Sequence, residues 1–295
     1  MVDSPHNHLA TPAQQLPFTS RSEEWLATLV RGGQVTPDPT RARGGERPRP
    51  VARTDRNSLI AHEQLVEKAR KGRIDVYFAG DSITRRWGAS DAQYASLLAN
   101  WRRNFFGWNA ANFGWGGDTT RNILWRLENG ELDGVDPKII VLLAGTNDVG
   151  NAASRGAEDP RIADVASGIE AILEVCRRKA PNATIVLMGI TPRNDAVAVM
   201  PVIDAINERI SKLADGKKVR YVNINDRLAG GDGTFFEGMA NRDGLHLDVG
   251  GYQVWADALK PIFAELLGPP ASTDHAPPPT GDPSATNGPA AHTAP

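Results

Sequence analysis

The sequence of 295 residues contains one cysteine, Cys176, so no disulfide can form within the chain. It also contains no run of the ~18–20 apolar residues that a membrane-spanning helix requires. Its charges nearly cancel, with 33 Lys and Arg against 35 Asp and Glu and a formal net charge of −2. That balance gives no reason to expect a nucleic acid or an anionic membrane as a partner. The expected organisation is therefore one sizeable domain, with tails, built on its own hydrophobic core.

Several motifs of nucleotide and metal chemistry are missing as well. The chain has no Gly-x-x-x-x-Gly-Lys-Ser/Thr loop and no Gly-x-Gly-x-x-Gly after an expected strand, which argues against nucleotide binding. It has no Gly-x-Ser-x-Gly elbow, which argues against an ordinary α/β-hydrolase. No histidines and cysteines are grouped at metal-ligand spacing, so we predict no metal site.

The two ends of the chain differ in composition from its middle. Residues 1–55 are rich in proline, glycine and arginine, which predicts a linker with one short helix at the apolar patch of residues 25–30. Residues 269–295 are rich in proline, alanine and threonine, and we expect a disordered tail there. Residues 56–268 form the expected folded domain. The N-terminus shows no signal-peptide pattern, yet a cleaved signal would leave the same sequence, so the compartment stays open.

Apolar runs and helical periodicity alternate through this middle region. Helical spacing of apolar residues predicts one helix before the apolar run at residues 74–79. It predicts others after the runs at residues 110–113, 138–144 and 183–190, and a last helix over residues 251–267. Such alternation predicts a three-layer α/β/α fold with a parallel sheet. The five runs expected to be buried strands are Ile74–Ala79, Ala110–Phe113, Lys138–Ala144, Ala183–Ile190 and Val219–Ile224.

Polar motifs follow three of the expected strands. Gly80-Asp81-Ser82 comes after the first, Gly116-Gly117-Asp118 after the second and Gly145-Thr146-Asn147-Asp148 after the third. A fourth motif, Asp243-Gly244-Leu245-His246, precedes the last helix. Because parallel sheets bind ligands at the C-terminal ends of their strands, we expect these four motifs to meet at one rim.

Ser82, His246 and Asp243 have the residue types needed for nucleophilic catalysis. Of the six histidines, His246 alone is placed for this role, since the others lie in terminal segments or, like His62, on the polar face of a helix. His246 would take the proton of Ser82, while Asp243 would fix the imidazole tautomer. The alternative for the serine motif is a turn with a helix cap, and we assign Asp81 to that structural role.

Acyl transfer also requires hydrogen-bond donors for the oxygen that becomes negative. The backbone N–H groups of Ser82 and Gly117 and the side-chain amide of Asn147 are the expected donors. Asp118 and Asp148 are expected to be structural residues near the site. Trp87, Trp115 and Trp125 lie near these motifs in sequence, and we expect one or more to line the rim, with core packing favoured for Trp125.

These motifs resemble, in order and separation, the four blocks of the SGNH (GDSL-type) hydrolases over residues 57–267. Residues 112–132 are similar to the catalytic subunits of the intracellular platelet-activating factor acetylhydrolases. The resemblance implies a flavodoxin-like sheet of order 2-1-3-4-5 and an esterase mechanism that uses Ser82, His246, Asp243, Gly117 and Asn147 without a cofactor. The acetylhydrolase subunits form dimers, which makes a homodimer one expected assembly.

The leading hypothesis is a serine esterase that hydrolyses short acyl esters, from acetyl to butyryl. The preference for short chains is expected because no long apolar lid segment follows any catalytic loop. Two other reactions use the same groups, namely deacetylation of a carbohydrate and hydrolysis of a thioester. The alternative of another class is a binding module that has the fold without catalysis. The expected partner is a small-molecule or carbohydrate ester, rather than a nucleic acid or an integral membrane.

Overall fold

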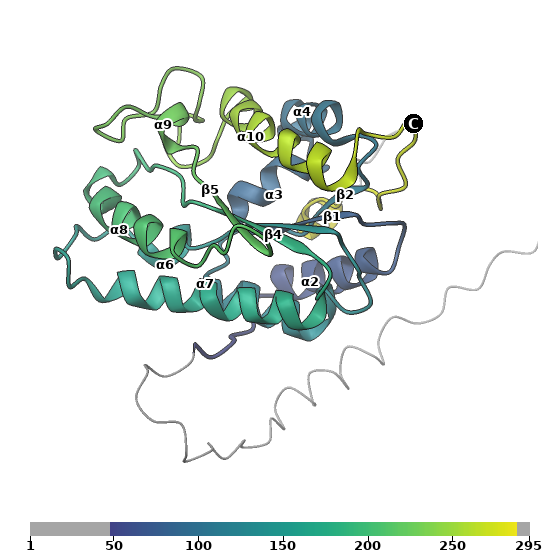
Figure 1. The fold of residues 1–295 in the computed structure, drawn as a ribbon, viewed down its shortest axis with the longest axis horizontal. Coiled ribbons are helices and arrows are strands. Elements are labelled where there is room, and N and C mark those ends of the chain that lie inside the picture. Colours follow the sequence, from purple (N-terminus) through teal and green to yellow (C-terminus); the bar gives the residue numbers. More distant parts are fainter. Residues whose placement is uncertain (1–47, 288–295) are drawn as a thin grey trace, which may run out of the picture. The chain divides into compact units, whose positions relative to one another are not determined.

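A computed structural model describes residues 48–287, and the predicted helix at residues 25–30 lies outside them. Five parallel strands form one sheet in the order β2-β1-β3-β4-β5 (Figure 1). This confirms the predicted three-layer fold and its strand order. All five predicted strands are present and each is shorter than predicted, with β1 ending one residue later: β1 Val76–Gly80, β2 Ala110–Asn112, β3 Ile139–Leu143, β4 Thr184–Met188 and β5 Val219–Val222.

Helices cover both faces of the sheet (Figure 1). One face is covered by α2 Arg56–Ala69, α5 Thr120–Arg126, α7 Pro160–Lys179 and α8 Met200–Ser211. The other is covered by α3 Ser82–Gly88, α4 Ala95–Phe105, α9 Asn225–Leu228 and α10 Val249–Leu267. The remaining elements are short helices: η1 Ala92–Tyr94, η2 Leu127–Glu131, α6 Thr146–Val149, η3 Val197–Val199 and η4 Pro283–Asn287.

The helices predicted between residues 56 and 268 are confirmed, and among residues 48–287 α4 is the one long helix that the periodicity did not indicate. Its buried face carries Asn100 and Asn104 among the apolar residues, which interrupts the apolar pattern. Both amides are satisfied inside the fold: Asn100 Oδ1 accepts from Trp87 Nε1 at 2.9 Å, and Asn104 Nδ2 donates to Asn100 O. A buried amide with its hydrogen bonds made costs little, so the helix packs despite its polar positions.

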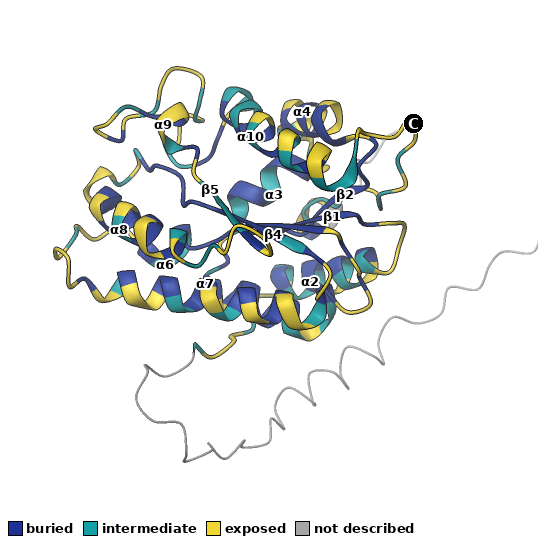
Figure 2. Cartoon of the chain, viewed as in Figure 1, coloured by how far each residue is buried: buried dark blue, intermediate teal, exposed yellow. Residues whose placement is uncertain are grey.

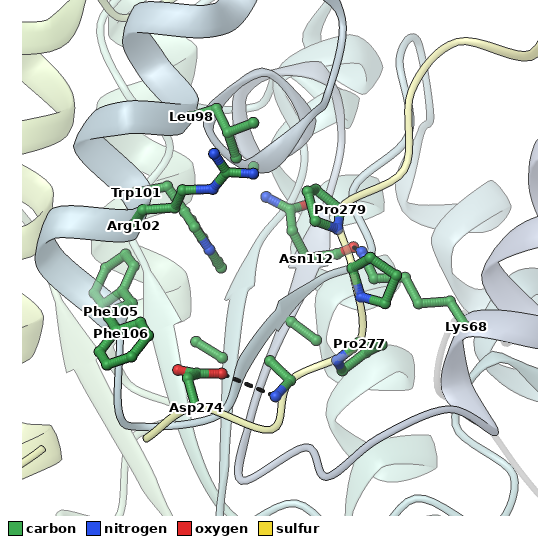
Figure 3. Close-up of a pocket in the computed structure, with 15 residues that line it drawn as sticks. Lys68, Leu98, Trp101, Arg102, Phe105, Phe106, Asn112, Asp274, Pro277 and Pro279 are labelled. Atoms are coloured by element: carbon green, nitrogen blue, oxygen red, sulfur yellow. Dashed lines mark hydrogen bonds between the residues drawn. The ribbon is translucent and has the colours of Figure 1, made fainter. Parts of the chain in front are cut away.

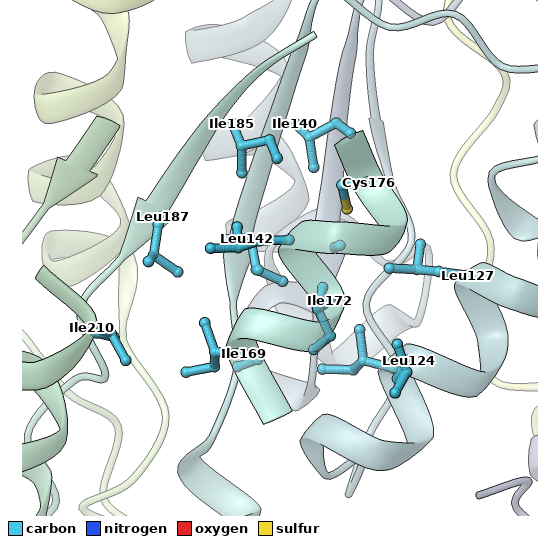
Figure 4. Close-up of a cluster of buried hydrophobic side chains, with 14 of the residues drawn as sticks. Leu124, Leu127, Ile140, Leu142, Ile169, Ile172, Cys176, Ile185, Leu187 and Ile210 are labelled. Atoms are coloured by element: carbon cyan, nitrogen blue, oxygen red, sulfur yellow. The ribbon is translucent and has the colours of Figure 1, made fainter. Parts of the chain in front are cut away.

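The core is split by the sheet into two clusters. Along β3, Ile140 and Leu142 face α7, whereas Ile139, Val141 and Leu143 face the layer of α3 and α10. Figure 2 shows helices whose sheet-facing sides are buried, and Figure 4 shows Leu142 packed near Ile169 and Ile172 of α7. Burying a Leu or Ile side chain contributes ~1.5–3 kcal/mol, so this strand anchors both layers.

The C-terminal segment differs from the expectation of disorder. Residues 269–287 lie against the domain, and residues 288–295 lie outside the part that the structure describes. Gly107 N donates to Asp274 Oδ2 at 2.6 Å, His275 N donates to Asn109 Oδ1 at 2.7 Å, and Arg73 N donates to His275 O at 2.9 Å. Composition does not reveal such a partner, because the groups that bind the segment belong to loops flanking β1 and β2.

None of the helices within residues 48–287 combines the length and the apolar character needed to cross a membrane.

Candidate active site

Ser82 is the first residue of α3, directly after β1 ends. Asp81 caps this helix, because its Oδ1 accepts from Ile83 N at 2.9 Å. The preceding Gly80 has no room for a side chain, since a Cβ there would lie 2.1 Å from Thr84 Oγ1 and 2.6 Å from Leu143 O. Asp81 is fully buried, and burial raises its pKa to about 7, opposed by the Ile83 hydrogen bond. The local sequence thus builds a tight turn with Ser82 at its end.

A hydrogen-bonded chain joins the serine to the fourth motif. His246 Nε2 lies 2.8 Å from Ser82 Oγ, and His246 Nδ1 lies 2.8 Å from Asp243 Oδ2. The other oxygen of Asp243 accepts the backbone N–H groups of Leu245 and His246, at 3.0 and 2.9 Å. These bonds fix the carboxylate in the orientation that binds the ring. The fold thus brings Ser82 and His246, which are 164 positions apart, into direct contact.

The charges of this chain follow from its surroundings. Partial burial acts to raise the pKa of Asp243, but hydrogen bonds from His246 and Leu245 outweigh it and lower the pKa to about 2. The pKa of His246 is lowered from its ordinary value, first by burial and then by the cation of Arg86, while Asp243 opposes both. The imidazole is therefore neutral at pH 7 and can accept a proton from the serine.

Arg86 is a residue that the sequence analysis missed. Its Nη1 donates to Asp243 Oδ2 at 3.1 Å, so that oxygen lies against both the histidine ring and a guanidinium. The guanidinium also lies over the ring of Tyr94, 5.4 Å from its centroid. A basic residue one helical turn after a candidate nucleophile is a weak signal, because most such residues are solvated.

The loop after β2 lies beside the serine. A Cβ on Gly116 would lie 3.9 Å from Ser82 Cβ, and Gly117 adopts φ +78°, a conformation that favours glycine. Asn147 Nδ2 donates to Asp118 O at 2.8 Å, which ties the third motif to this loop. Because an amide NH₂ carries two donors, this bond uses one and leaves a second. Asn147 thus binds the residue that follows Gly117 in this loop.

Asp118 and Asp148 make hydrogen bonds that anchor the loop after β2. Asp148 accepts from both Thr120 N and Thr120 Oγ1, at 2.9 and 2.7 Å, and thereby binds the first residue of α5. Asp118 is fully buried and accepts from Arg126 Nε at 2.6 Å. Burial raises the pKa of Asp118 to about 6, with Arg126 acting in the opposite direction. These contacts agree with structural roles for both carboxylates.

Arg126 is the centre of a buried charge network under the site. It donates to Gly80 O, Phe113 O, Asp118 and Glu131, so one side chain joins the ends of β1 and β2. Glu131 in turn contacts His62 Nδ1 at 2.8 Å. His62 is therefore buried, and its expected place on a polar helix face is wrong. The apolar pattern around Arg126 does not indicate this buried charge network, because a basic residue among apolar positions of a helix has no visible partner in the sequence.

The three tryptophans are almost fully buried. Trp87 packs in the core against Trp101 and Tyr252, and Trp115 Nε1 donates to Ser58 Oγ at 2.8 Å. Trp125 packs against His62, with ring centroids 4.8 Å apart. The burial of Trp125 agrees with the core role favoured for it, and the expectation that one or more of these rings lines the rim stays a prediction.

A separate cavity of about 310 Å³ lies between α4, β2 and residues 274–279 (Figure 3). Trp101 and Phe105 form an apolar wall, and Lys68 lies on the opposite side, where its Nζ donates to Asn112 O at 2.7 Å. Burial lowers the pKa of Lys68 to about 7. No residue of the Ser82, His246 and Asp243 set lines this cavity, so the chemistry described above lies elsewhere.

Comparisons with known proteins identify relatives of the chain. The model of the GDSL-like Lipase/Acylhydrolase family matches residues 78–254. The alpha2 subunit of platelet-activating factor acetylhydrolase IB is 33% identical over 211 residues in Rattus norvegicus, covering 71% of this chain and 84% of the relative. The same subunit from Homo sapiens is 33% identical over 220 residues, with the same coverage.

Solved structures give the same fold. A putative platelet activating factor from Streptococcus pneumonia has a TM-score of 0.52 and 26% identity, covering 69% of this chain and 93% of its own. A GDSL-like lipase from Bacteroides thetaiotaomicron has a TM-score of 0.56 and 20% identity, covering 70% of this chain and 98% of its own.

Proposed function

Because the chain belongs to the GDSL-like lipase/acylhydrolase family and is a carboxylic ester hydrolase, we propose that Ser82, His246 and Asp243 are its catalytic triad. The observation that carries this proposal is the unbroken contact from Asp243 through His246 to Ser82 Oγ, with 2.8 Å at each step. Nucleophile, base and orienting group then stand in the order that acyl transfer requires.

In the proposed reaction, Ser82 Oγ attacks the ester carbonyl carbon while His246 Nε2 takes the serine proton. The carbonyl oxygen becomes negative and accepts hydrogen bonds from Ser82 N, Gly117 N and the free Nδ2–H of Asn147. His246 then gives its proton to the leaving alcohol, and the C–O ester bond breaks. A water molecule, deprotonated by the same ring, cleaves the acyl-serine and releases the acid.

We propose short acyl esters, from acetyl to butyryl, as the substrates. The similarity to subunits named acetylhydrolases supports a small acyl group. The long helix that follows His246, α10, packs its apolar side into the core and so does not offer an apolar surface for a long acyl chain.

The test is hydrolysis of p-nitrophenyl acetate and butyrate by the full chain and by Ser82→Ala. We expect kcat/KM to fall by ~10³-fold or more in the variant, the order seen when a triad nucleophile is removed. Ser211→Ala is the matched control, because its hydroxyl donates only to Glu208 O within α8, and it should keep the wild-type rate.

Equal slow rates in wild type and Ser82→Ala would mean that this serine is only a turn residue, and a binding module would then be the better description. An ester series from acetate to palmitate tests the acyl preference. Fastest turnover of the longest chain would contradict the proposed substrates while leaving the triad in place. Acetylated xylan and acyl-CoA in parallel distinguish simple esters from carbohydrate esters and thioesters.

A further inference from the structure

The peptide unit between Gly116 and Gly117 carries a contact from outside the four motifs. Arg53 Nη1 donates to Gly116 O at 3.1 Å and to Asp118 Oδ1 at 3.3 Å. A Cβ built on Gly117 would lie 3.2 Å from the same nitrogen. Arg53 precedes the region matched by the family, residues 78–254, so its role does not follow from family membership.

This contact bears on the proposed oxyanion donor because a peptide unit is planar. The Gly116 carbonyl and the Gly117 N–H belong to one unit, and in a trans peptide they point in opposite directions. The described chain contains no cis peptide bond. A hydrogen bond that fixes the Gly116 oxygen therefore also fixes the direction of the Gly117 N–H. Since glycine has the widest backbone freedom, a Gly-Gly unit has the greatest need of such a restraint.

The donor on the oxygen is a cation, which adds a second effect. Charge-assisted hydrogen bonds are roughly twice as strong as neutral ones. A bond to the carbonyl oxygen also polarises the peptide, so its N–H becomes a stronger donor by ~10–30%. The fixed direction of the Gly117 N–H and its greater donor strength both stabilise a negative substrate oxygen that lies in front of it.

Arg53 is itself held in place. Its Nη2 pairs with Asp55 Oδ2 at 3.0 Å, and Asp55 Oδ1 caps α2 by accepting from Ser58 N at 2.9 Å. Two residues upstream, Val51 N donates to Arg121 O at 3.0 Å and Val51 O accepts from Asn122 Nδ2 at 2.9 Å. The side chain of Arg53 is 31% exposed, so its guanidinium is partly shielded from water. The segment therefore binds the start of α5 on one side and the Gly116–Gly117 peptide on the other.

We propose that Arg53 is a positioning residue for ester hydrolysis, which holds and polarises the Gly116–Gly117 peptide so that the Gly117 N–H faces the developing oxyanion. The proposal rests on the proposed function, and it assigns to residues 51–55 a part in the active site. Arg53 does not touch the substrate, and its effect passes through one peptide bond.

The expected size follows from the donor that is affected. Removing one oxyanion-hole donor outright costs ~10²–10³ in kcat. Arg53→Gln leaves the Gly117 N–H in place but frees its direction, so we expect kcat to fall by ~10-fold or more, with KM within about twofold. The loss falls on kcat because the interaction strengthens only in the transition state.

The experiment compares wild type, Arg53→Gln, Arg53→Lys and Arg56→Gln on p-nitrophenyl butyrate. Arg53→Lys keeps a cation with fewer donors, and we expect it to recover part of the lost kcat. Arg56 is exposed three residues away, and Arg56→Gln should match wild type within twofold. A trifluoromethyl ketone inhibitor, whose adduct with serine carries an oxyanion, should bind more weakly to Arg53→Gln by the same factor as the loss of kcat/KM.

Unchanged kcat in Arg53→Gln would overturn the proposal, and so would a fall in kcat without weaker inhibitor binding, because the oxyanion site would then be intact. A fall that Arg53→Lys does not reduce at all would also count against it. These results are separate from the test of the triad. If wild type and Ser82→Ala hydrolyse the ester equally slowly, the proposed function itself fails.

Discussion

At the scale of single residues, Asp243 has an unusual set of partners. Its Oδ2 contacts both His246 Nδ1 and Arg86 Nη1, while its Oδ1 accepts two backbone N–H groups. The carboxylate is well satisfied in its charged form, which is consistent with its lowered pKa. Arg86 and the His246 ring therefore both interact with the negative charge of Asp243. The cation of Arg86 also opposes protonation of His246 to an imidazolium.

The pH dependence of the reaction follows from these charges. His246 must be neutral to accept the serine proton, so kcat/KM falls as pH drops through its pKa. Burial and Arg86 hold that pKa below the ordinary ~6.5, whereas Asp243 and Asp195 act to raise it. We expect wild-type kcat/KM to be half-lost only below pH 6.5, in a profile measured at constant ionic strength.

Arg86→Gln tests whether the cation of Arg86 lowers the pKa of His246. Removing a cation that lowers the pKa of His246 must raise that pKa, so the acid limb of the profile should move to higher pH. Arg103→Gln, on the exposed side of α4, should leave the limb in place. A limb that stays fixed in Arg86→Gln, or moves to lower pH, would contradict this account.

At the scale of elements, residues 269–287 bind α2 and the loops around the β2 edge of the sheet. Asp274 accepts from Gly107 N and Ala276 N, and Asp282 accepts from Asn57 Nδ2 at 2.8 Å. Asp282 N also donates to Asp91 Oδ1 at 3.0 Å. An edge strand with unpaired backbone groups is prone to pair with other chains, and a segment that covers it lowers that risk.

Asp274→Ala should loosen this segment without unfolding the domain. The variant leaves Gly107 N and Ala276 N without their acceptor, which costs ~1–3 kcal/mol locally when such groups stay buried. We expect faster amide hydrogen exchange at Arg73 and His275, whose N–H groups bind across this junction. Ser272→Ala, at an exposed position, is the control. Unchanged exchange in Asp274→Ala would show that Asp274 does not hold the segment.

At the scale of the whole molecule, β3 lies in the centre of the sheet and joins the two core clusters. All five of its residues are buried, and Leu142 belongs to the same buried cluster as Cys176 of α7 (Figure 4). Burial raises the pKa of the Cys176 thiol to about 12, so the thiolate that reacts with labelling reagents does not form in the folded state. Cys176 can therefore report on opening of the fold.

Leu142→Ala should destabilise the whole domain by ~2–5 kcal/mol, because it leaves a cavity at the middle of the core. When opening is fast relative to labelling, the rate at which Cys176 reacts with a disulfide reagent follows the open population. A loss of 2 kcal/mol then speeds labelling by about 30-fold. Val197→Ala, at an exposed side chain, should change the rate little. Equal labelling of Leu142→Ala and wild type would mean that the thiol is reached by local opening instead.

Much of the fold follows from the sequence. Runs such as residues 139–143 are apolar throughout because both faces of a parallel strand are covered, and the intervening helices show one apolar face. The turn at Gly80, Asp81 and Ser82 is also local, since it depends on a glycine and a helix cap. Alternation of such elements admits few topologies, so a parallel sheet with the motifs at its rim could be predicted, whereas the strand order was implied by the family resemblance.

Only the tertiary structure decided which charges meet. Arg53, Arg86 and Arg126 look like ordinary basic residues in the sequence, yet each donates to a residue at or beside the proposed site, 63, 157 and 8 positions away. The same holds for His62 with Glu131 and for the C-terminal segment. Hydrogen bonds between polar groups have no period along the chain, and their strength depends on burial and on distances of a few tenths of an ångström. Burial by the other elements therefore determines which polar residues support the chemistry.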